Sequence, residues 1–376
     1  MYTVEIIDSL KKFDELKPEW DRLYGLREHS IFFSFDYVKN YFQIILEKFK
    51  NVSISIFIIK DASGKIIAIF PFTLVNTRFC FFLNVKILYQ EDFSLLPFYR
   101  FLIDPSVVVK NISEVLIEYL KQNQFWDILR WYNIPVDETC FEHFYEEFSK
   151  NFIVEKAVTE TLIIEVNKKY DEYLRANIKK KDVKEFQRQH RRLTELGAIK
   201  LVVFNTRESI EHELPRFYEI ENKNWKGRMG TSLLKTYQGL FFKRLIHLPS
   251  WDQKVNLFFL QVGKEYIAGL YAVIDQATFY LLKAGYDEKY YKYSPSTVLM
   301  YLVFERLFHE EIIKHIDCIG DFYSYERQFG VTARKKYTCF IYRKRQFAQI
   351  YMLLHNKINP FFIKYYNRIK NKSVED

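Results

Sequence analysis

The sequence has few cysteines, and their spacing does not suggest disulfide bonds or metal binding. The four are Cys80, Cys140, Cys318 and Cys339, and none belongs to a CxxC pair. The spacing therefore gives no support for a disulfide framework or a zinc site. This use of cysteine is typical of reducing compartments, so we expect a cytoplasmic protein.

Glycine, proline and long apolar runs are also scarce. With 11 glycines and 9 prolines in 376 residues, the chain has little material for long flexible linkers. Its first residues show no basic stretch followed by an apolar run, so we expect no signal peptide. No stretch approaches the ~18 uncharged apolar residues typical of a membrane-spanning helix, so we expect no such span.

The composition is that of a folded protein with a basic surface. Hydrophobic residues make up 49% and charged residues 27% of the chain, which indicates a globular protein. Compact domains usually have about 100–150 residues, so this length predicts two domains or one duplicated domain. The net charge of +9 favours anionic partners, namely phosphates, nucleic acid or an anionic membrane surface. A lysine-rich surface without such a partner would give the same charge.

The expected elements occur in the same order in both halves of the chain. In the first half, the apolar pattern predicts strands, a helix and a further strand over residues 52–59, 66–74, 81–89, 112–121 and 126–132. In the second half, the same series is expected over residues 255–262, 266–274, 278–284, 296–309 and 315–319. A strand–hairpin–strand–helix–strand order that occurs twice indicates two α/β units.

We therefore predict the α/β (α+β) class, with two mixed-sheet domains at residues 1–155 and 156–345 and a basic aromatic tail at 346–376. The segment between the repeats is expected to be helical. Further helices are expected over residues 9–26, 31–42, 179–197, 208–225 and 233–248.

The helix expected over residues 179–197 has a basic side. Val183, Phe186 and Leu193 share its apolar side, while Arg188 and Arg192 are among the cations on its other faces. Such a face is usually solvated surface, and binding of an anion is the alternative.

The residues Ser294-Pro295-Ser296-Thr297 open the long apolar helix of the second half. Proline in the first helical turn, with serine just before it, is a strong signal for a helix start. The first N–H groups of a helix have no helical partner, and the helix dipole favours negative charge there, so a pyrophosphate would fit. Lys292 could add a positive charge. The alternative is an ordinary, well-capped helix.

A second polar cluster follows the strand expected at residues 315–319. It contains Asp317, Gly320, Asp321, Tyr325 and Phe329. Groups just beyond the carboxyl ends of strands line the ligand crevice in open α/β folds. Asp321 is therefore placed for proton transfer or for holding an acceptor, and Tyr325 offers a phenolic donor. Alternatively, Asp321 only caps a loop or pairs with Arg327.

These motifs resemble those of a known family. The run AGYDxxYxxYSPS at 284–296 and the run IDCIGDxxxYE at 316–326 are similar to two signatures of the CelD/BioF2-like acetyltransferases of the GNAT superfamily. The basic helix that ends at Gly197, and Trp225 after the next helix, also match the family pattern. The sequence departs from the family where Ser296 replaces a common glycine and Glu326 replaces a usual lysine. The motifs cover about residues 160–345, and the first half is similar only in element order.

The resemblance implies two tandem GNAT-like domains and an acyltransferase that uses acetyl-CoA or another acyl-CoA and no metal. The donor would bind at Lys292, Tyr293, Ser294, Ser296 and Thr297, with its pantetheine arm along the strand at 278–284.

The resemblance also implies roles for residues outside the donor site. Asp321 and Tyr325 would be catalytic, and Trp225, Arg188 and Arg192 would bind the acceptor. That acceptor would be an amine or hydroxyl of a glycan, a cell-envelope precursor or a small metabolite. In the alternative, FemAB-like relatives use aminoacyl-tRNA, and the basic helix at 179–192 would bind tRNA phosphates.

The end of the chain suggests a further, non-catalytic possibility. Residues 333–374 contain 11 lysines and arginines and no acidic residue. Phe347, Ile350, Tyr351, Leu354 and Ile358 fall at helical spacing within this stretch. This basic amphipathic segment would suit the surface of an anionic membrane, at the inner face of the cell membrane. The alternative is a helix that packs on the preceding domain with a solvated basic face.

Overall fold

The computed structural model describes residues 2–79, 83–90, 100–310, 312–320, 328–330 and 332–357, and it divides into two compact units. As far as these residues extend, unit 1 holds 1–29, 45–158 and the chain from 337 onward, and unit 2 holds 30–44 and 159–336. The units are therefore not continuous stretches of sequence. They differ from the ranges 1–155 and 156–345 because residues 30–44 belong to unit 2 and the end of the chain belongs to unit 1.

Unit 1 is built on a mixed sheet in which strands follow one another in chain order. Its strands are β1 (Thr3–Ile7), β2 (Val52–Lys60), β3 (Ile66–Phe79), β4 (Leu83–Tyr89), β5 (Leu102–Ile103) and β6 (Ile128–Pro135). Neighbours from β1 to β4 are antiparallel, β4 and β6 are parallel, and β5 pairs with β3. The parallel pair requires a crossover, which a helix between β4 and β6 provides.

The helices of unit 1 are amphipathic, as a sheet-covering layer requires. They are α1 (Leu10–Glu15), α2 (Lys17–Gly25), α4 (Val109–Gln122), α5 (Phe141–Asn151) and α12 (Gln346–Lys357). In the crossover helix α4, Ile112, Leu116 and Leu120 recur every four residues and are fully buried. In α12, Ala348 and Tyr351 are buried while Ile350 and Leu353 are exposed, so one side of this helix packs on unit 1.

Unit 2 repeats the plan of unit 1. Its strands are β8 (Ile199–Phe204), β9 (Val255–Val262), β10 (Glu265–Asp275), β11 (Thr278–Tyr286) and β12 (His315–Asp317). Neighbours from β8 to β11 are antiparallel, and β11 and β12 are parallel. Two further strands, β7 (Ile153–Glu165) and β13 (Ala333–Tyr342), have residues in both units, and β7 pairs antiparallel with β12.

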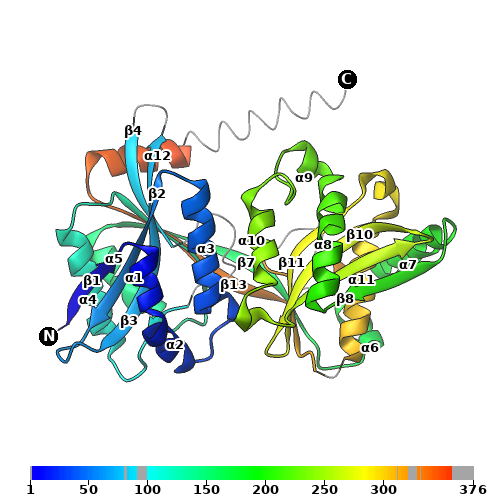
Figure 1. Ribbon diagram of the computed structural model, residues 1–376, viewed down its shortest axis with the longest axis horizontal. Helices are drawn as coiled ribbons and strands as arrows, with labels where there is room; N and C mark the ends of the chain where they lie inside the picture. The colour runs from blue at the N-terminus through cyan, green and yellow to red at the C-terminus, as the bar shows by residue number, and fades with distance from the viewer. Residues whose placement is uncertain are drawn as a thin grey trace. The chain divides into compact units, whose positions relative to one another are not determined.

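Helices cover both faces of the unit 2 sheet (Figure 1). They are η1 (Ile31–Phe33), α6 (Tyr170–Asn177), α7 (Lys180–Thr194), α8 (Arg207–Asn222), α9 (Trp225–Arg228), α10 (Tyr237–Leu245), η2 (Pro249–Trp251), η3 (Glu288–Tyr293) and α11 (Pro295–His309). Helix α3 (Phe35–Lys48) begins in unit 2 and ends in unit 1. Successive residues of β10 point to opposite faces of the sheet and so contact different layers of helices. Leu270 packs into the core that contains α11, whereas Tyr271 packs on Phe217 of α8 and Phe242 of α10.

The predicted fold class is confirmed. The order β2-β3-β4-α4-β6 of unit 1 returns as β9-β10-β11-α11-β12 in unit 2, with helices between the two repeats. Some elements were predicted wrongly. The helix expected over 31–42 is a 3-10 turn followed by α3, because Ser34 is extended between them. Strands β7, β8 and β13 were not predicted. None of the described helices has both the length and the apolar content that a bilayer crossing needs.

Candidate active site

The N-terminus of α11 carries N–H groups that no described side chain caps. The helix begins at Pro295, and the preceding Ser294 has a left-handed backbone with φ 48° and ψ 54°. The Ser294 side chain makes no capping hydrogen bond, although its carbonyl accepts from the Val298 N–H at 3.1 Å. The N–H groups of Ser296 and Thr297 therefore lie in the first turn of a 15-residue helix without a capping side chain. This arrangement can bind an anion.

Cationic and aromatic side chains gather on the turn just before this helix. Arg192, on α7, donates to the Lys292 carbonyl at 3.3 Å, and its guanidinium carbon lies 5.0 Å from the centre of the Tyr293 ring. The Lys292 ammonium lies at the same distance of 5.0 Å from that ring. Two positive charges thus flank Tyr293 at the entrance to α11. The structure brings Arg192 together with the predicted donor residues, whereas the sequence had suggested a place beside the acceptor.

The sheet opens next to this helix. Strands β11 and β12 pair only over Thr278–Tyr280 and His315–Asp317. Beyond that point β11 continues to Tyr286, but β12 has ended and the Cys318 N–H instead donates to the Leu162 carbonyl of β7. Within the described part of the chain, no strand pairs with this side of residues 281–286. A strand edge with unused backbone groups can bind an extended, amide-bearing chain, as in strand addition.

A buried carboxyl lies at the end of β12. Asp317 is 1% exposed, accepts the Ile319 N–H at 2.9 Å and faces the Arg334 guanidinium at 3.4 Å. Burial outweighs these favourable contacts and raises the pKa of Asp317 to about 6. This side chain is therefore anchored at the point where β11 and β12 part.

The raised pKa of Asp317 predicts a pH-dependent stability. The unfolded carboxyl, with its usual pKa near 3.8, ionises first as the pH rises, and the folded protein loses stability until the pH passes about 6. A shift of this size corresponds to roughly 3 kcal/mol. We expect Asp317→Asn to remove this dependence, so the wild-type unfolding temperature should fall relative to the variant between pH 4 and pH 7. If the unfolding temperatures of wild type and variant change with pH in the same way over that range, the assignment is wrong.

The remaining predicted residues lie in different environments. Arg188 forms an ion pair with Glu185 on its own helix at 2.6 Å, so its guanidinium is already engaged. Trp225 is the first residue of α9 and is 51% exposed, as an acceptor-binding side chain would need to be. Asp321, Tyr325 and the neighbouring Glu326 lie outside the described residues, and their predicted roles stay predictions.

The corresponding place in unit 1 is filled by the protein itself. There β4 pairs with β6 over Ile87–Tyr89 and Ile128–Arg130. The Arg130 guanidinium donates to the Tyr89 hydroxyl at 2.9 Å and also to the Tyr351 hydroxyl of α12. Since Arg130 is 7% exposed, the described residues of unit 1 show no comparable open strand end at this position.

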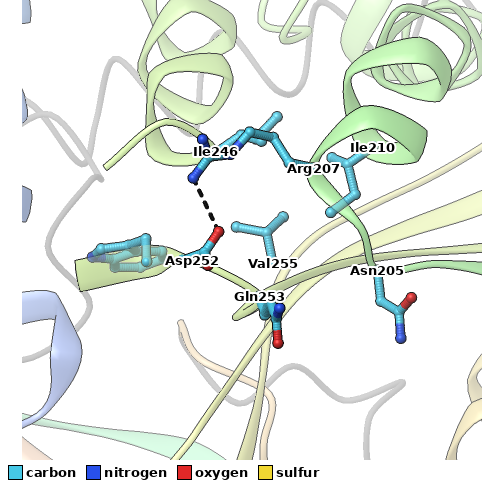
Figure 2. Close-up of a pocket in the computed structure, with 8 residues that line it drawn as sticks. Asn205, Arg207, Ile210, Ile246, Asp252, Gln253 and Val255 are labelled. Carbon is cyan, nitrogen blue, oxygen red and sulfur yellow. Dashed lines mark hydrogen bonds and ion pairs between the residues drawn. The ribbon is translucent and has the colours of Figure 1, made fainter. Parts of the chain in front are cut away.

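The hollow shown in Figure 2 is too small for such a ligand. It has room for about one water molecule, and an ion pair between Arg207 and Asp252 at 3.0 Å closes one side. It lies at the start of β9, at the opposite end of the sheet from residue 286 of β11. Its other lining residues are Asn205, Ile210, Ile246, Trp251, Gln253 and Val255. Among the residues that the structure describes, no three His, Cys, Asp or Glu side chains form a metal-binding group.

One charged pair at this site was missed by the sequence analysis. The Lys226 ammonium lies 3.0 Å from the Glu221 carboxylate, and Glu221 is only 1% exposed. The sequence did contain a signal. Glu221 follows Phe217 by four residues and Leu214 by seven, so it lies on the buried face of α8. A carboxylate on an apolar helix face requires a partner.

Residues 180–327 match the family of GNAT acetyltransferase domains. This match covers most of unit 2, including α7, the open strand edge and α11. No protein of curated function matches the sequence.

Several solved structures share the fold over almost the whole chain. FemX is 12% identical and has a TM-score of 0.56, with 94% of this chain and 99% of FemX covered. A conserved protein of unknown function from Bacteroides thetaiotaomicron is 12% identical with a TM-score of 0.51, covering 91% of this chain and 100% of its own. The C-terminal domain of a protein described as a lysylphosphatidylglycerol synthetase, from Agrobacterium fabrum, is 9% identical with a TM-score of 0.50 and coverages of 92% and 97%. At these identities the likeness concerns the fold alone.

Proposed function

Because residues 180–327 match the family of GNAT acetyltransferase domains and the chain shares the fold of FemX, we propose that it transfers an acyl group from acyl-CoA to an amine or hydroxyl. The acceptor we propose is a glycan, a cell-envelope precursor or a small metabolite. The observation that carries the proposal is the uncapped N-terminus of α11, which follows β11, a strand whose edge is open, after the short 3-10 helix η3.

The donor would bind through two groups of contacts. Its pyrophosphate takes the N–H groups of Ser296 and Thr297, and Lys292 and Arg192 supply positive charge beside them. Its pantetheine arm lies along residues 281–286 of β11, on the side away from β10, where no described strand pairs with the backbone. The extra side chain of Ser296, compared with the glycine of the family pattern, adds a hydroxyl donor at this turn.

The chemistry would require positioning and proton transfer more than covalent catalysis. The acceptor nitrogen or oxygen attacks the thioester carbonyl and forms a new bond to carbon, the carbon–sulfur bond breaks, and CoA leaves as the thiol. Asp321 would take the proton of the acceptor, and Tyr325 would give a proton to the leaving sulfur. Trp225, exposed on α9, would contact the acceptor.

Calorimetry with acetyl-CoA, longer acyl-CoAs and free CoA tests the donor. We expect one molecule bound per chain with an affinity of about 1 µM to 1 mM, because among the described residues only those of unit 2 form an open strand end at this position. Absence of binding by every CoA species would refute the proposal. Turnover of wild type against Asp321→Asn then tests the base, because the variant should bind CoA normally but lose transfer.

A second candidate function keeps the transferase and changes the donor to aminoacyl-tRNA. Exposed cations on α7 and on the residue before it favour this alternative. They are Lys179, Lys180, Lys181, Lys184 and Arg191. Ionic strength separates the two donors. Between 50 and 200 mM salt, tRNA binding should weaken about 10³-fold or more, whereas CoA binding should change far less.

A further inference from the structure

A buried ion pair holds a lysine at the open edge of β11. Glu221 accepts the Leu233 N–H at 2.8 Å with one carboxylate oxygen and pairs with Lys226 at 3.0 Å through the other. The Lys226 ammonium also donates to the Ala284 carbonyl at 2.9 Å. Two of its three N–H donors are thus used, and the described residues provide no third partner for it.

The Ala284 carbonyl faces the opening between β11 and β12. In an antiparallel ladder, successive residues direct their N–H and C=O groups alternately toward and away from the neighbouring strand. The Asp287 N–H bonds to Ile267 of β10, and Gly285 is paired with Gly269, so the backbone groups of Gly285 point toward β10. Those of Ala284, between them, point to the other side. Lys226 therefore lies on the side of residues 281–286 that faces away from β10, where no described strand pairs with them.

The segment that carries Lys226 is fixed in place. Asn224 caps α9 by accepting the Lys226 N–H at 2.8 Å, and Gly227 lies so close to the Asn222 carbonyl that any side chain would clash. Gly285 likewise allows Glu221 to approach β11, because an added Cβ would lie 2.6 Å from the Glu221 Cα. These close contacts fix the backbone that carries Lys226 between helix α8 and strand β11, and the two bonds to Glu221 and Ala284 orient its ammonium.

From this geometry we propose that Lys226 is a catalytic residue that binds the carbonyl oxygen of the donor's acyl group and that Glu221 is its positioning residue. The inference rests on the proposed acyl-CoA function. The ammonium fits this role because its charge is fixed near the strand edge and its side chain is 22% exposed, so one N–H can reach a bound ligand.

In the transfer step, the carbonyl oxygen becomes an oxyanion when the acceptor attacks. The negative charge then lies on the oxygen that Lys226 binds. The lysine therefore stabilises the tetrahedral intermediate more strongly than it stabilises the donor before the reaction. When the carbon–sulfur bond breaks, the electron pair leaves with the sulfur, the oxygen becomes a carbonyl again, and Lys226 keeps all its protons.

Calorimetry with acetyl-CoA and S-ethyl-CoA tests this role without turnover, because the second ligand lacks the carbonyl oxygen and is otherwise alike. We expect wild type to bind acetyl-CoA about tenfold more tightly than S-ethyl-CoA. Lys226→Met should lose this preference and keep its affinity for S-ethyl-CoA. Because the single variant leaves Glu221 buried without its partner, the double variant Glu221→Gln with Lys226→Met provides a charge-balanced second test.

The outcomes separate the two proposals. Equal binding of the two ligands by wild type, or a preference that survives in both variants, overturns the role of Lys226 and leaves the donor assignment intact. Failure of wild type to bind either ligand overturns the acyl-CoA function and the role of Lys226 with it. Where turnover is measured, Lys226→Met should lower kcat about 10²-fold and leave KM for acetyl-CoA within about tenfold.

Discussion

Replacing Thr297 by glutamate is expected to abolish binding of CoA while leaving the fold intact. Thr297 is the third residue of α11, and its N–H is one of the uncapped groups assigned to the pyrophosphate. A carboxylate in the first turn would accept these N–H groups and repel the phosphates. Two like charges about 4 Å apart near a protein surface cost about 4 kcal/mol, so we expect at least a 100-fold loss of affinity.

The same substitution should not weaken the helix. A negative charge at a helix N-terminus stabilises the helix by about 0.3–1 kcal/mol, so the unfolding temperature should stay level or rise slightly. Thr297→Gln is the matched control, because glutamine has the shape of glutamate without its charge, and it should lose no more than about tenfold in affinity. Calorimetry and thermal melts on the three proteins measure both effects. Normal CoA binding by Thr297→Glu would show that the diphosphate lies elsewhere.

Replacing Gly285 by alanine should destabilise unit 2 strongly. The added Cβ would lie 2.6 Å from the Cα of Glu221, which is backbone of α8 and cannot turn aside as a flexible side chain can. Helix and strand must then separate, and overpacking of this kind costs about 1–3 kcal/mol, sometimes more. We expect a lower unfolding temperature. We also expect a loss of donor binding, because the displaced strand β11 is the proposed binding site of the pantetheine arm.

Gly25 provides the matched control for that substitution. It is the last residue of α2, and an added Cβ there would meet nothing within 4 Å. Alanine is a better helix former than glycine, so Gly25→Ala should leave stability unchanged or raise it by about 0.5–1 kcal/mol. If both variants unfold at the same temperature as the wild type, the close contact between α8 and β11 is not important for stability.

Local patterns were sufficient to predict the repeated part of the fold. Alternating serine and isoleucine in β2, apolar runs in β9–β11, and turns such as the one at Gly263 predict their elements directly from the sequence. Strand β13 was missed because its first residues, Ala333–Lys336, are mostly charged and its burial does not alternate. Only its pairing within the folded chain makes it a strand.

The candidate site was predicted in part for the same reason. Ser294-Pro295 marks the start of α11, so the position of this helix N-terminus could be predicted from the sequence, and its binding of an anion stays a prediction. The left-handed backbone of Ser294 and the place of Arg192 beside Lys292 depend on contacts between segments about 100 residues apart, which no local pattern contains. The Glu221–Lys226 pair spans a helix end, where charged residues are commonly solvated.

Because residues 30–44 belong to unit 2, this unit is incomplete without a piece of the first half of the sequence. Tyr37 stacks on Trp251 with ring centres 5.0 Å apart, Phe32 packs edge-on against Tyr280 of β11 at 5.0 Å, and the Asn40 amide donates to the Phe241 carbonyl at 3.3 Å. A gene divided at the boundary between the repeats would yield a second product with these aromatic rings bared to water and prone to aggregate. We therefore expect the second repeat to fold poorly when it is expressed without residues 30–44.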